Sequence, residues 1–280
     1  MSHETLTRIE RALEERFGTK IPVAADQAGA DTLARMLEHR SHRSYSARPL
    51  SAELLQLLFA CALSAPSKSD LQQADIVHVS DGVKRKALAD LIPDNPWVRS
   101  APEFLVFCAD NRRTRQLAAQ RGKPFANDHL DAFMNAAVDA GIVMTTFIHA
   151  AEAAGLGCCP ISSVRNHAQA VSDLLGLPDW VFPLAGLCIG YPAEAGTITS
   201  RLPLDVTVHV DHYDESGIAA KIDRYDRRRD ARQPYPKQRD VERYGKAEFY
   251  GWSEDKARQY AVPQRADFGA FIRGKRFNLT

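Results

Sequence analysis

The sequence lacks an excess of charge of either sign. Its 280 residues hold 36 Lys and Arg against 35 Asp and Glu, which leaves a net charge of +1. A field this weak over the whole molecule argues neither for nucleic acid nor for an anionic membrane as a partner. Any cationic function must therefore be confined to a local cluster of side chains.

The chain also lacks a secretory signal, because residues 1–30 are charged and contain no continuous apolar core. No segment is expected to reach the length of an apolar membrane span. The five cysteines are odd in number and three sit inside apolar runs, so we expect reduced core residues. Adjacent Cys158 and Cys159 without a second pair of ligands are poor zinc ligands, and no metal site is predicted. These absences favour a cytoplasmic protein.

Two nucleotide-binding motifs are missing. A glycine-rich dinucleotide fingerprint follows a strand, whereas Gly155-Leu156-Gly157 follows a predicted helix and lacks the third glycine. No Walker-type phosphate loop occurs either. If the chain binds a nucleotide, side chains must hold its phosphate.

The order of the apolar patterns predicts an α+β or α/β layer structure of one domain, in a chain that is 45% hydrophobic and 25% charged. Continuous apolar runs at 104–108 and 181–189 predict buried strands, and a further strand is predicted at 76–79. Residues 130–154 are apolar or small nearly all the way round, which predicts a central helix buried by its own domain or by a partner subunit. Residues 158–163 are expected to form a loop. The alternation of Val206, Val208 and Val210 predicts a half-exposed edge strand at 205–211.

Residues 39–44 form a cluster of cationic and hydroxyl side chains, with two histidines, two arginines and two serines. A helix that Ser51 is expected to cap follows shortly after. Cations and hydroxyls of this kind can bind a phosphate. The alternative is a solvated basic turn, since most charge runs are solvated. The rest of the sequence decides between the two.

Several short motifs, taken in order, resemble the FMN-dependent nitroreductase family, and its oxygen-insensitive, NADPH-preferring branch most. Over residues 31–212 they are Glu38-His39-Arg40-Ser41-His42-Arg43, Pro49-Leu50-Ser51, Ala65-Pro66-Ser67-Lys68-Ser69, Ala154-Gly155-Leu156-Gly157, Leu187-Cys188-Ile189-Gly190-Tyr191-Pro192-Ala193 and Arg201-Leu202-Pro203-Leu204. Each motif alone is weak, whereas the ordered set is specific. The resemblance favours the phosphate interpretation of residues 39–44.

The resemblance implies a central, mostly antiparallel sheet sandwiched by helices, in a homodimer with FMN at each subunit interface. Three parts are expected: an N-terminal helix and linker (1–30), an FMN-binding domain (31–212), and a basic C-terminal extension (213–280) that packs on the domain or on the partner subunit. Residues 222–244 of this extension include few aliphatic side chains and cannot form a core of their own.

The resemblance also assigns cofactor-binding residues. His39, Arg40 and Ser41 match the positions around the FMN phosphate and ribitol, and Arg201 matches a second phosphate cation. Arg43 matches the cation beside flavin N1 and O2, where reduced flavin carries its negative charge. The remaining matches are Ser67, Lys68 and Ser69, which meet FMN across the dimer interface; Asn95, near the pyrimidine edge; and Pro160, Ile161, Ser162 and Ser163, whose backbone N–H groups face the ring. No side chain is assigned as a catalytic acid or base.

Two positions depart from the family pattern. Ser162 and Ser163 stand where relatives of this branch usually have glycines, and Thr199 stands where they have a lysine. The first change is expected to alter the floor of the pocket near flavin N5, and the second removes a phosphate cation.

The arginine-rich segment 222–244 leaves two interpretations open. Arg227, Arg228 and Arg229 could dock the 2′-phosphate of NADPH, because guanidinium groups suit phosphates. The alternative is a solvated helix, because Asp223, Asp226 and Asp230 alternate with the arginines.

The function implied by the resemblance is an FMN-dependent oxidoreductase. It would move a hydride from NADPH or NADH through the flavin to a nitroaromatic, a quinone or a similar acceptor in a ping-pong cycle. One alternative is a flavoenzyme of the same family with a dedicated metabolite, such as a dehydrogenase or a reductive dehalogenase. Another is a flavin-binding module without turnover. An arginine-rich nucleic-acid binder is disfavoured, because the net charge of the chain is close to neutral.

Overall fold

The computed structural model describes residues 2–280, and their contacts divide the chain into two compact units. We call residues 41–196 and 265–280 the sheet unit, and residues 1–40 and 197–264 the helical unit. The three-part division expected from the sequence stays a prediction.

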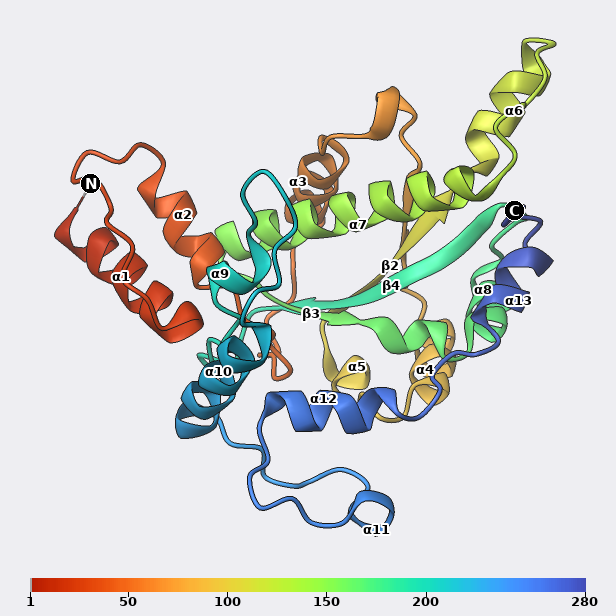
Figure 1. The fold of residues 1–280 in the computed structure, drawn as a ribbon. Coiled ribbons are helices and arrows are strands. Elements are labelled where there is room, and N and C mark those ends of the chain that lie inside the picture. The colour runs from red at the N-terminus through yellow and green to blue at the C-terminus, as the bar shows by residue number, and fades with distance from the viewer. Residues whose placement is uncertain (1) are drawn as a thin grey trace. The chain divides into compact units, whose positions relative to one another are not determined.

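The sheet unit is built on a four-stranded sheet of order β1-β2-β4-β3 (Figure 1). Its strands are β1 (Ala74–His78), β2 (Glu103–Asp110), β3 (Gly157–Ile161) and β4 (Val181–Gly190), and every pairing is antiparallel. The helices are α3 (Ala52–Leu63), α4 (Gly82–Leu91), α5 (Trp97–Ser100), α6 (Arg112–Gln120), α7 (Leu130–Ala153), α8 (Ala168–Leu175) and α13 (Phe268–Gly274), with 3-10 turns η1 (Lys68–Asp70) and η2 (Ser162–Arg165). The expected α+β class and the antiparallel sheet are confirmed.

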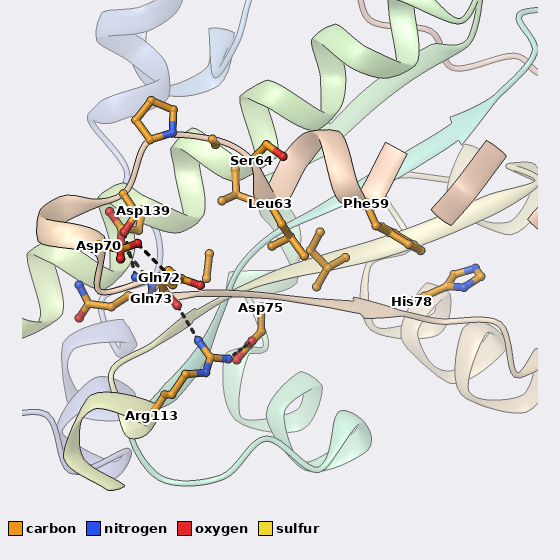
Figure 2. Close-up of a pocket in the computed structure, with 16 residues that line it drawn as sticks. Phe59, Leu63, Ser64, Asp70, Gln72, Gln73, Asp75, His78, Arg113 and Asp139 are labelled. Atoms are coloured by element: carbon orange, nitrogen blue, oxygen red, sulfur yellow. Dashed lines mark hydrogen bonds and ion pairs between the residues drawn. The ribbon is translucent and has the colours of Figure 1, made fainter. Parts of the chain in front are cut away.

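The loop between α3 and β1 carries unusual backbone angles. Ser69, Asp70 and Gln72 have φ of 50°, 57° and 51°, in the left-handed region that costs energy for residues other than glycine. The carboxylate of Asp139, in α7, accepts the backbone N–H of Lys68 at 3.0 Å. It also accepts the backbone N–H of Gln73 at 3.2 Å (Figure 2). The Ser67 hydroxyl accepts the N–H of Gln72 at 2.9 Å. These hydrogen bonds hold the loop in its strained form.

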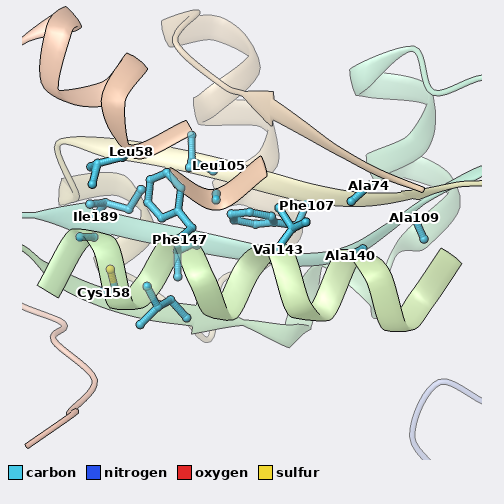
Figure 3. Packing of buried hydrophobic residues seen from close by; sticks show 14 of the residues in the cluster. Leu58, Ala74, Leu105, Phe107, Ala109, Ala140, Val143, Phe147, Cys158 and Ile189 are labelled. Atoms are coloured by element: carbon cyan, nitrogen blue, oxygen red, sulfur yellow. The ribbon is translucent and has the colours of Figure 1, made fainter. Parts of the chain in front are cut away.

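The core of the sheet unit lies on both faces of the sheet, as the continuous apolar runs predicted. Leu105 and Phe107 of β2 face α3 and α7, where they pack with Leu58 and Phe147 (Figure 3). The alternate residues Phe104, Val106 and Cys108 pack with Leu88 of α4, Val98 of α5 and Val171 of α8. Helices therefore sandwich the sheet, which confirms that part of the expectation.

Three sequence expectations were wrong. Residues 157–161 form strand β3 instead of a loop; Pro160 is tolerated there because β3 is an edge strand, where a missing N–H leaves no ladder bond unmade. Residues 205–211 form no strand: Leu204–Thr207 is the short helix α9, and Val208 and Val210 are 60% and 75% exposed, so no buried face rewards the alternation.

The third error concerns α7, whose length and mean hydropathy would allow it to cross a membrane, against the expectation that no segment does. In the structure, one face of α7 packs into the core of the sheet unit through Ala136, Ala140, Val143 and Phe147. Asp139 is also buried, and its carboxylate accepts a backbone hydrogen bond from the loop between α3 and β1. These are the contacts of a core helix, as predicted for residues 130–154.

The helical unit contains α1 (His3–Phe17), α2 (Ala30–Leu37), α9, α10 (Ile218–Arg232), α11 (Val241–Tyr244) and α12 (Trp252–Tyr260). Ile9 and Leu13 of α1 pack against Ala30 and Ala34 of α2. Aromatic and polar contacts hold the C-terminal part, as its few aliphatic residues require. For example, buried Asp255 accepts hydrogen bonds from Tyr250 at 3.0 Å and Arg239 at 2.9 Å.

Candidate functional site

In the sheet unit, the segment after Arg40 runs beside strand β3. Ser41 forms a parallel bridge with Cys158, whose carbonyl accepts the N–H of His42 at 2.9 Å. A Cβ on Gly157 would lie 2.7 Å from the His42 ring, so only glycine permits this approach. The Tyr45 hydroxyl donates to the His42 carbonyl at 2.6 Å, and burial raises the pKa of this phenol, which keeps it a donor. Arg43 is thereby fixed at the end of β3.

Arg43 is a solvent-exposed cation held by an aromatic ring. Its guanidinium carbon lies 5.2 Å from the ring centroid of Trp97, at the start of α5, within the range of cation–π attraction. Cys159 of β3 lies nearby: burial raises the pKa of its thiol, while the charge of Arg43 and a contact with Trp97 oppose that rise. This thiol remains protonated near neutral pH, and the fixed positive charge at this place comes from Arg43.

A second contact joins Asn95 to the turn after β3. The Asn95 side-chain amide donates to the Ser163 hydroxyl at 2.9 Å, and both residues are half-buried. Arg265, far along the chain, donates to the Ser162 hydroxyl at 3.2 Å and to the Asn166 side chain at 2.8 Å. Four of the predicted residues, Arg43, Asn95, Ser162 and Ser163, are thus tied into one region of the sheet unit.

The other predicted residues of the turn behave differently. Ile161 is 2% exposed and its side chain belongs to the core. Pro160 is exposed and has no backbone N–H, so the prediction that all four residues present N–H groups fails at this position. Donors can come from Ile161, Ser162 and Ser163 only.

Ser67, Lys68 and Ser69 lie in the strained loop. Of these three residues, Ser67 lines a cavity of about 1000 Å³ beside β1, together with Asp70 and Gln72 of the same loop (Figure 2). Phe59, Leu63 and Val143 form its apolar part, and Ser67, Asp75 and Arg113 belong to its polar part. Arg113 pairs with Asp75 and lies 3.4 Å from a carboxylate oxygen of Asp110. Burial and a hydrogen bond with Asp110 raise the pKa of Asp75 to about 6, although Arg113 opposes the rise.

His39, Arg40 and Arg201 belong to the helical unit. The Arg201 side chain is exposed, and its guanidinium donates to the Thr199 hydroxyl at 2.6 Å. Thr199, which replaces the family's lysine, therefore orients the remaining cation. The backbone N–H of Arg201 donates to the carbonyl of Arg16 at 2.7 Å.

The arginines of α10 have contacts that neither sequence interpretation included. Arg228 donates to the carbonyl of Arg201 at 2.9 Å, and Arg229 lies 4.1 Å from the ring centroid of Tyr235. Arg227 is exposed, with its guanidinium 5.4 Å from the Phe249 ring. Docking of an NADPH phosphate on this helix stays a prediction.

Two residues of the site were missed from the sequence. Trp97 follows a turn that contains Pro93 and Pro96, and an aromatic residue two positions after Asn95 was a usable signal. Arg265 is separated from Ser162 by 103 residues, and no local pattern indicates that contact.

The fold is an antiparallel sheet sandwiched by helices, and the sequence carries an ordered set of cationic and hydroxyl residues. Both features are those of the family that the sequence resembles, and comparison with family models agrees. The model of the nitroreductase family matches residues 36–191, and that of the nitroreductase family C-terminal domain matches residues 200–280. The chain belongs to the nitroreductase family.

Within that family, the chain is 36% identical over 200 residues to an FMN reductase [NAD(P)H] of Bacillus subtilis, covering 70% of this chain and 80% of the relative. It is 37% identical over 188 residues to an NADPH-flavin oxidoreductase of Vibrio harveyi, covering 67% and 77%. The solved structure of NfrA2 from B. megaterium is similar with a TM-score of 0.80 at 30% identity, covering 89% of this chain and 98% of that one.

Proposed function

We propose that this protein is an FMN-dependent NAD(P)H oxidoreductase that reduces flavins, quinones or nitroaromatic compounds. The relatives named as an FMN reductase and an NADPH-flavin oxidoreductase support this activity. The single structural observation that carries it is the fixed guanidinium of Arg43, tied to Trp97 at one end of β3 beside Asn95 and the serine turn. Bound FMN supplies the chemistry by accepting a hydride at N5 and passing it to the acceptor.

The residues present fit that cofactor. An isoalloxazine ring needs a cation near N1 and O2, polar donors at its pyrimidine edge, and a surface on which it can stack. Arg43 supplies the cation, Asn95 and Ser163 supply an amide and a hydroxyl, and the turn after β3 carries the backbone N–H groups of Ser162 and Ser163. We assign Ser67, Lys68 and Ser69 to contact with the FMN held by the other subunit of a dimer.

The phosphate of FMN is assigned to His39, Arg40, Ser41 and Arg201. Guanidinium groups form charge-assisted hydrogen bonds with phosphate, and hydroxyls complete such sites. No Lys stands near Arg201 in sequence, so its orientation by Thr199 matters more than it would with a second cation on the same segment.

The chain's own residues need only bind and orient in the reaction. Arg43 stabilises negative charge where it develops, and the fixed ring of Trp97 keeps this cation in place. The ping-pong order implied by the resemblance means that nicotinamide and acceptor occupy the site in turn. No side chain is assigned to hold or move a proton.

The active form is proposed to be a homodimer. Leu130, Met134 and Val138 are 50%, 56% and 48% exposed and recur every fourth residue along one face of α7, while Leu57 and Leu63 of α3 are 60% and 58% exposed. Rows of exposed apolar residues on two neighbouring helices mark interaction surfaces. A second copy of the chain is the occupant we assign to them.

A cytoplasmic location is proposed with it. All five cysteines are free, and four of them are buried in the core, which suits a reducing compartment.

Two-substrate kinetics test the proposed function. Initial rates at varied NADPH and a quinone such as menadione should give parallel double-reciprocal lines with the FMN-reconstituted protein. Intersecting lines would reject the ping-pong order. A protein that binds FMN but reduces neither quinones, nitroaromatics nor free flavin would instead be a flavin-binding module or an enzyme with a dedicated metabolite.

A further inference from the structure

Arg16 is a buried arginine in the last turn of α1, a helix to which the proposed function gives no role. The residue is 6% exposed. Its guanidinium donates to three backbone carbonyls of the helical unit: that of Leu37 at 2.9 Å, that of Thr199 at 3.3 Å, and that of His39. A buried guanidinium costs free energy unless its donors are satisfied, and backbone carbonyls satisfy these.

The main chain of Arg16 makes further contacts with the same region. Its carbonyl accepts the backbone N–H of Arg201 at 2.7 Å and a guanidinium N–H of Arg228 at 3.3 Å. Arg228 also donates to the carbonyl of Arg201 at 2.9 Å. Gly18 permits this packing, because a Cβ there would lie 2.5 Å from the Arg228 side chain.

The carbonyls held by Arg16 belong to two segments that are distant in sequence. One segment ends in His39 and Arg40, and the other runs from Thr199 to Arg201. These segments carry the cations that the proposed function assigns to the FMN phosphate. A rigid, planar guanidinium can hold two such segments in one arrangement, which a flexible ammonium group does less well.

Helix α1 packs against α2 and is hydrogen-bonded to it, which fixes the position of Arg16 relative to α2. Glu38, at the end of α2, accepts two hydrogen bonds from the half-buried side chain of Arg8, at 3.2 and 2.6 Å. Ile9, Leu13, Ala30 and Ala34 form the apolar contact between the helices. Movement of α1 would therefore move the carbonyls of Leu37 and His39 with it.

We propose that α1 braces the phosphate site of the cofactor, with Arg16 as the positioning residue that sets the backbone of His39 and of residues 199–201. This inference rests on the proposed function, because it takes His39, Arg40 and Arg201 as phosphate ligands. Arg16 acts through these residues and does not touch the cofactor. Its removal should weaken binding of the phosphate group and leave recognition of the flavin ring unchanged.

The test compares FMN with riboflavin, which has the same ring and no phosphate. Dissociation constants of both are measured by flavin fluorescence on the full-length deflavinated protein and on its Arg16→Met and Arg16→Lys variants. Arg11→Met is the matched control, because Arg11 lies on the same helix and its side chain is 58% exposed, so its ion pair with Glu38 contributes little to stability.

We expect Arg16→Met to weaken FMN binding by about tenfold or more, the effect of one lost charge-assisted hydrogen bond, with riboflavin binding changed less than about twofold. Arg16→Lys should fall between wild type and Arg16→Met, and Arg11→Met should resemble wild type. The ³¹P chemical shift of bound FMN should move in both Arg16 variants and not in Arg11→Met. If only Arg16→Lys folds, its FMN-to-riboflavin ratio and its ³¹P shift decide the question.

Equal losses for FMN and riboflavin would make Arg16 a general structural residue and overturn the brace. Unchanged FMN binding in the Arg16 variants would also overturn it, while leaving the proposed function intact. Wild-type protein that binds riboflavin as tightly as FMN would overturn the phosphate assignment itself, and the brace with it.

Discussion

The buried carboxylate of Asp139 accepts the backbone N–H of Lys68 at 3.0 Å, and this contact joins the central helix α7 to the strained loop after α3. The same carboxylate accepts the N–H of Gln73 at the other end of that loop. Asp139 thus holds the backbone conformation of the loop that contains Ser67 and Ser69. Nothing in the sequence around Asp139 indicates this role.

Replacement of Asp139 should destabilise the protein. Asp139→Asn puts an amide N–H2 group where an acceptor is needed, which leaves a buried backbone N–H without a partner and costs about 2 kcal/mol. Urea denaturation at a fixed protein concentration measures the change. Asp131→Asn, on the exposed first turn of the same helix, is the control and should change stability little. Equal effects of the two substitutions would contradict the role given to Asp139.

Arg43 should set the reduction potential of the bound flavin. Arg43→Gln removes the cation beside N1 and O2, so the potential should fall by about 30 to 60 mV, the equivalent of one charge-assisted hydrogen bond for a two-electron couple. Dye-equilibration potentiometry gives the value. Arg48→Gln is the control, because Arg48 stacks on Tyr191 at 3.9 Å, away from these residues. An unchanged potential in Arg43→Gln would reject this role.

The pH dependence of stability should show the titration of Asp75. Its pKa of about 6 in the folded protein exceeds the ordinary value of 3.8, so between these values the folded state binds more protons than the unfolded chain. Stability contributed by protonated Asp75 is therefore full below about pH 4 and is lost as the pH rises through about 6.

Asp75→Asn removes this titration, because an amide does not ionise. Relative to wild type, the variant should gain stability on going from pH 4.5 to pH 7.5, as followed by urea unfolding at each pH. If the difference in unfolding free energy between the two proteins stays constant with pH, or changes in the opposite direction, the pKa of Asp75 is not raised in the folded protein. Asp70→Asn is the comparison on an exposed residue of the same cavity.

The exposed apolar face of α7 should be the dimer contact. Met134→Lys with Val138→Lys places two charges in that face, and sedimentation equilibrium should then give the monomer mass instead of twice that mass. Val83→Lys is the control, because Val83 is 79% exposed on α4 and belongs to no row of exposed apolar residues on that helix. A dimeric double variant, or a monomeric wild type, would contradict the proposed interface.

The strands and the central helix were predictable where burial imposes a strong pattern. β2 and β4 are buried on both faces, so their sequences read as continuous apolar runs, and α7 combines length with small and apolar residues. β3 was missed because Gly157 and Pro160 indicate a break, and only the sheet order reveals that Pro160 lies on an edge.

Within the site, the local cluster at residues 39–44 was predictable because its charges are consecutive. Contacts that join distant segments were not: no periodicity links Arg265 to Ser162, or Arg16 to Thr199. Trp97 lies between these cases, since its place near Asn95 was visible while its stacking with Arg43 was not. The cofactor assignments themselves stay predictions until a flavin is bound.

Anaerobic half-reactions test the central claim most directly. FMN-reconstituted protein is mixed with a stoichiometric amount of NADPH and then, in a second step, with menadione. The account predicts that the visible flavin absorption bleaches in the first step and returns fully in the second. A flavin spectrum that stays unchanged with both NADPH and NADH, or a protein that takes up no FMN, would contradict it.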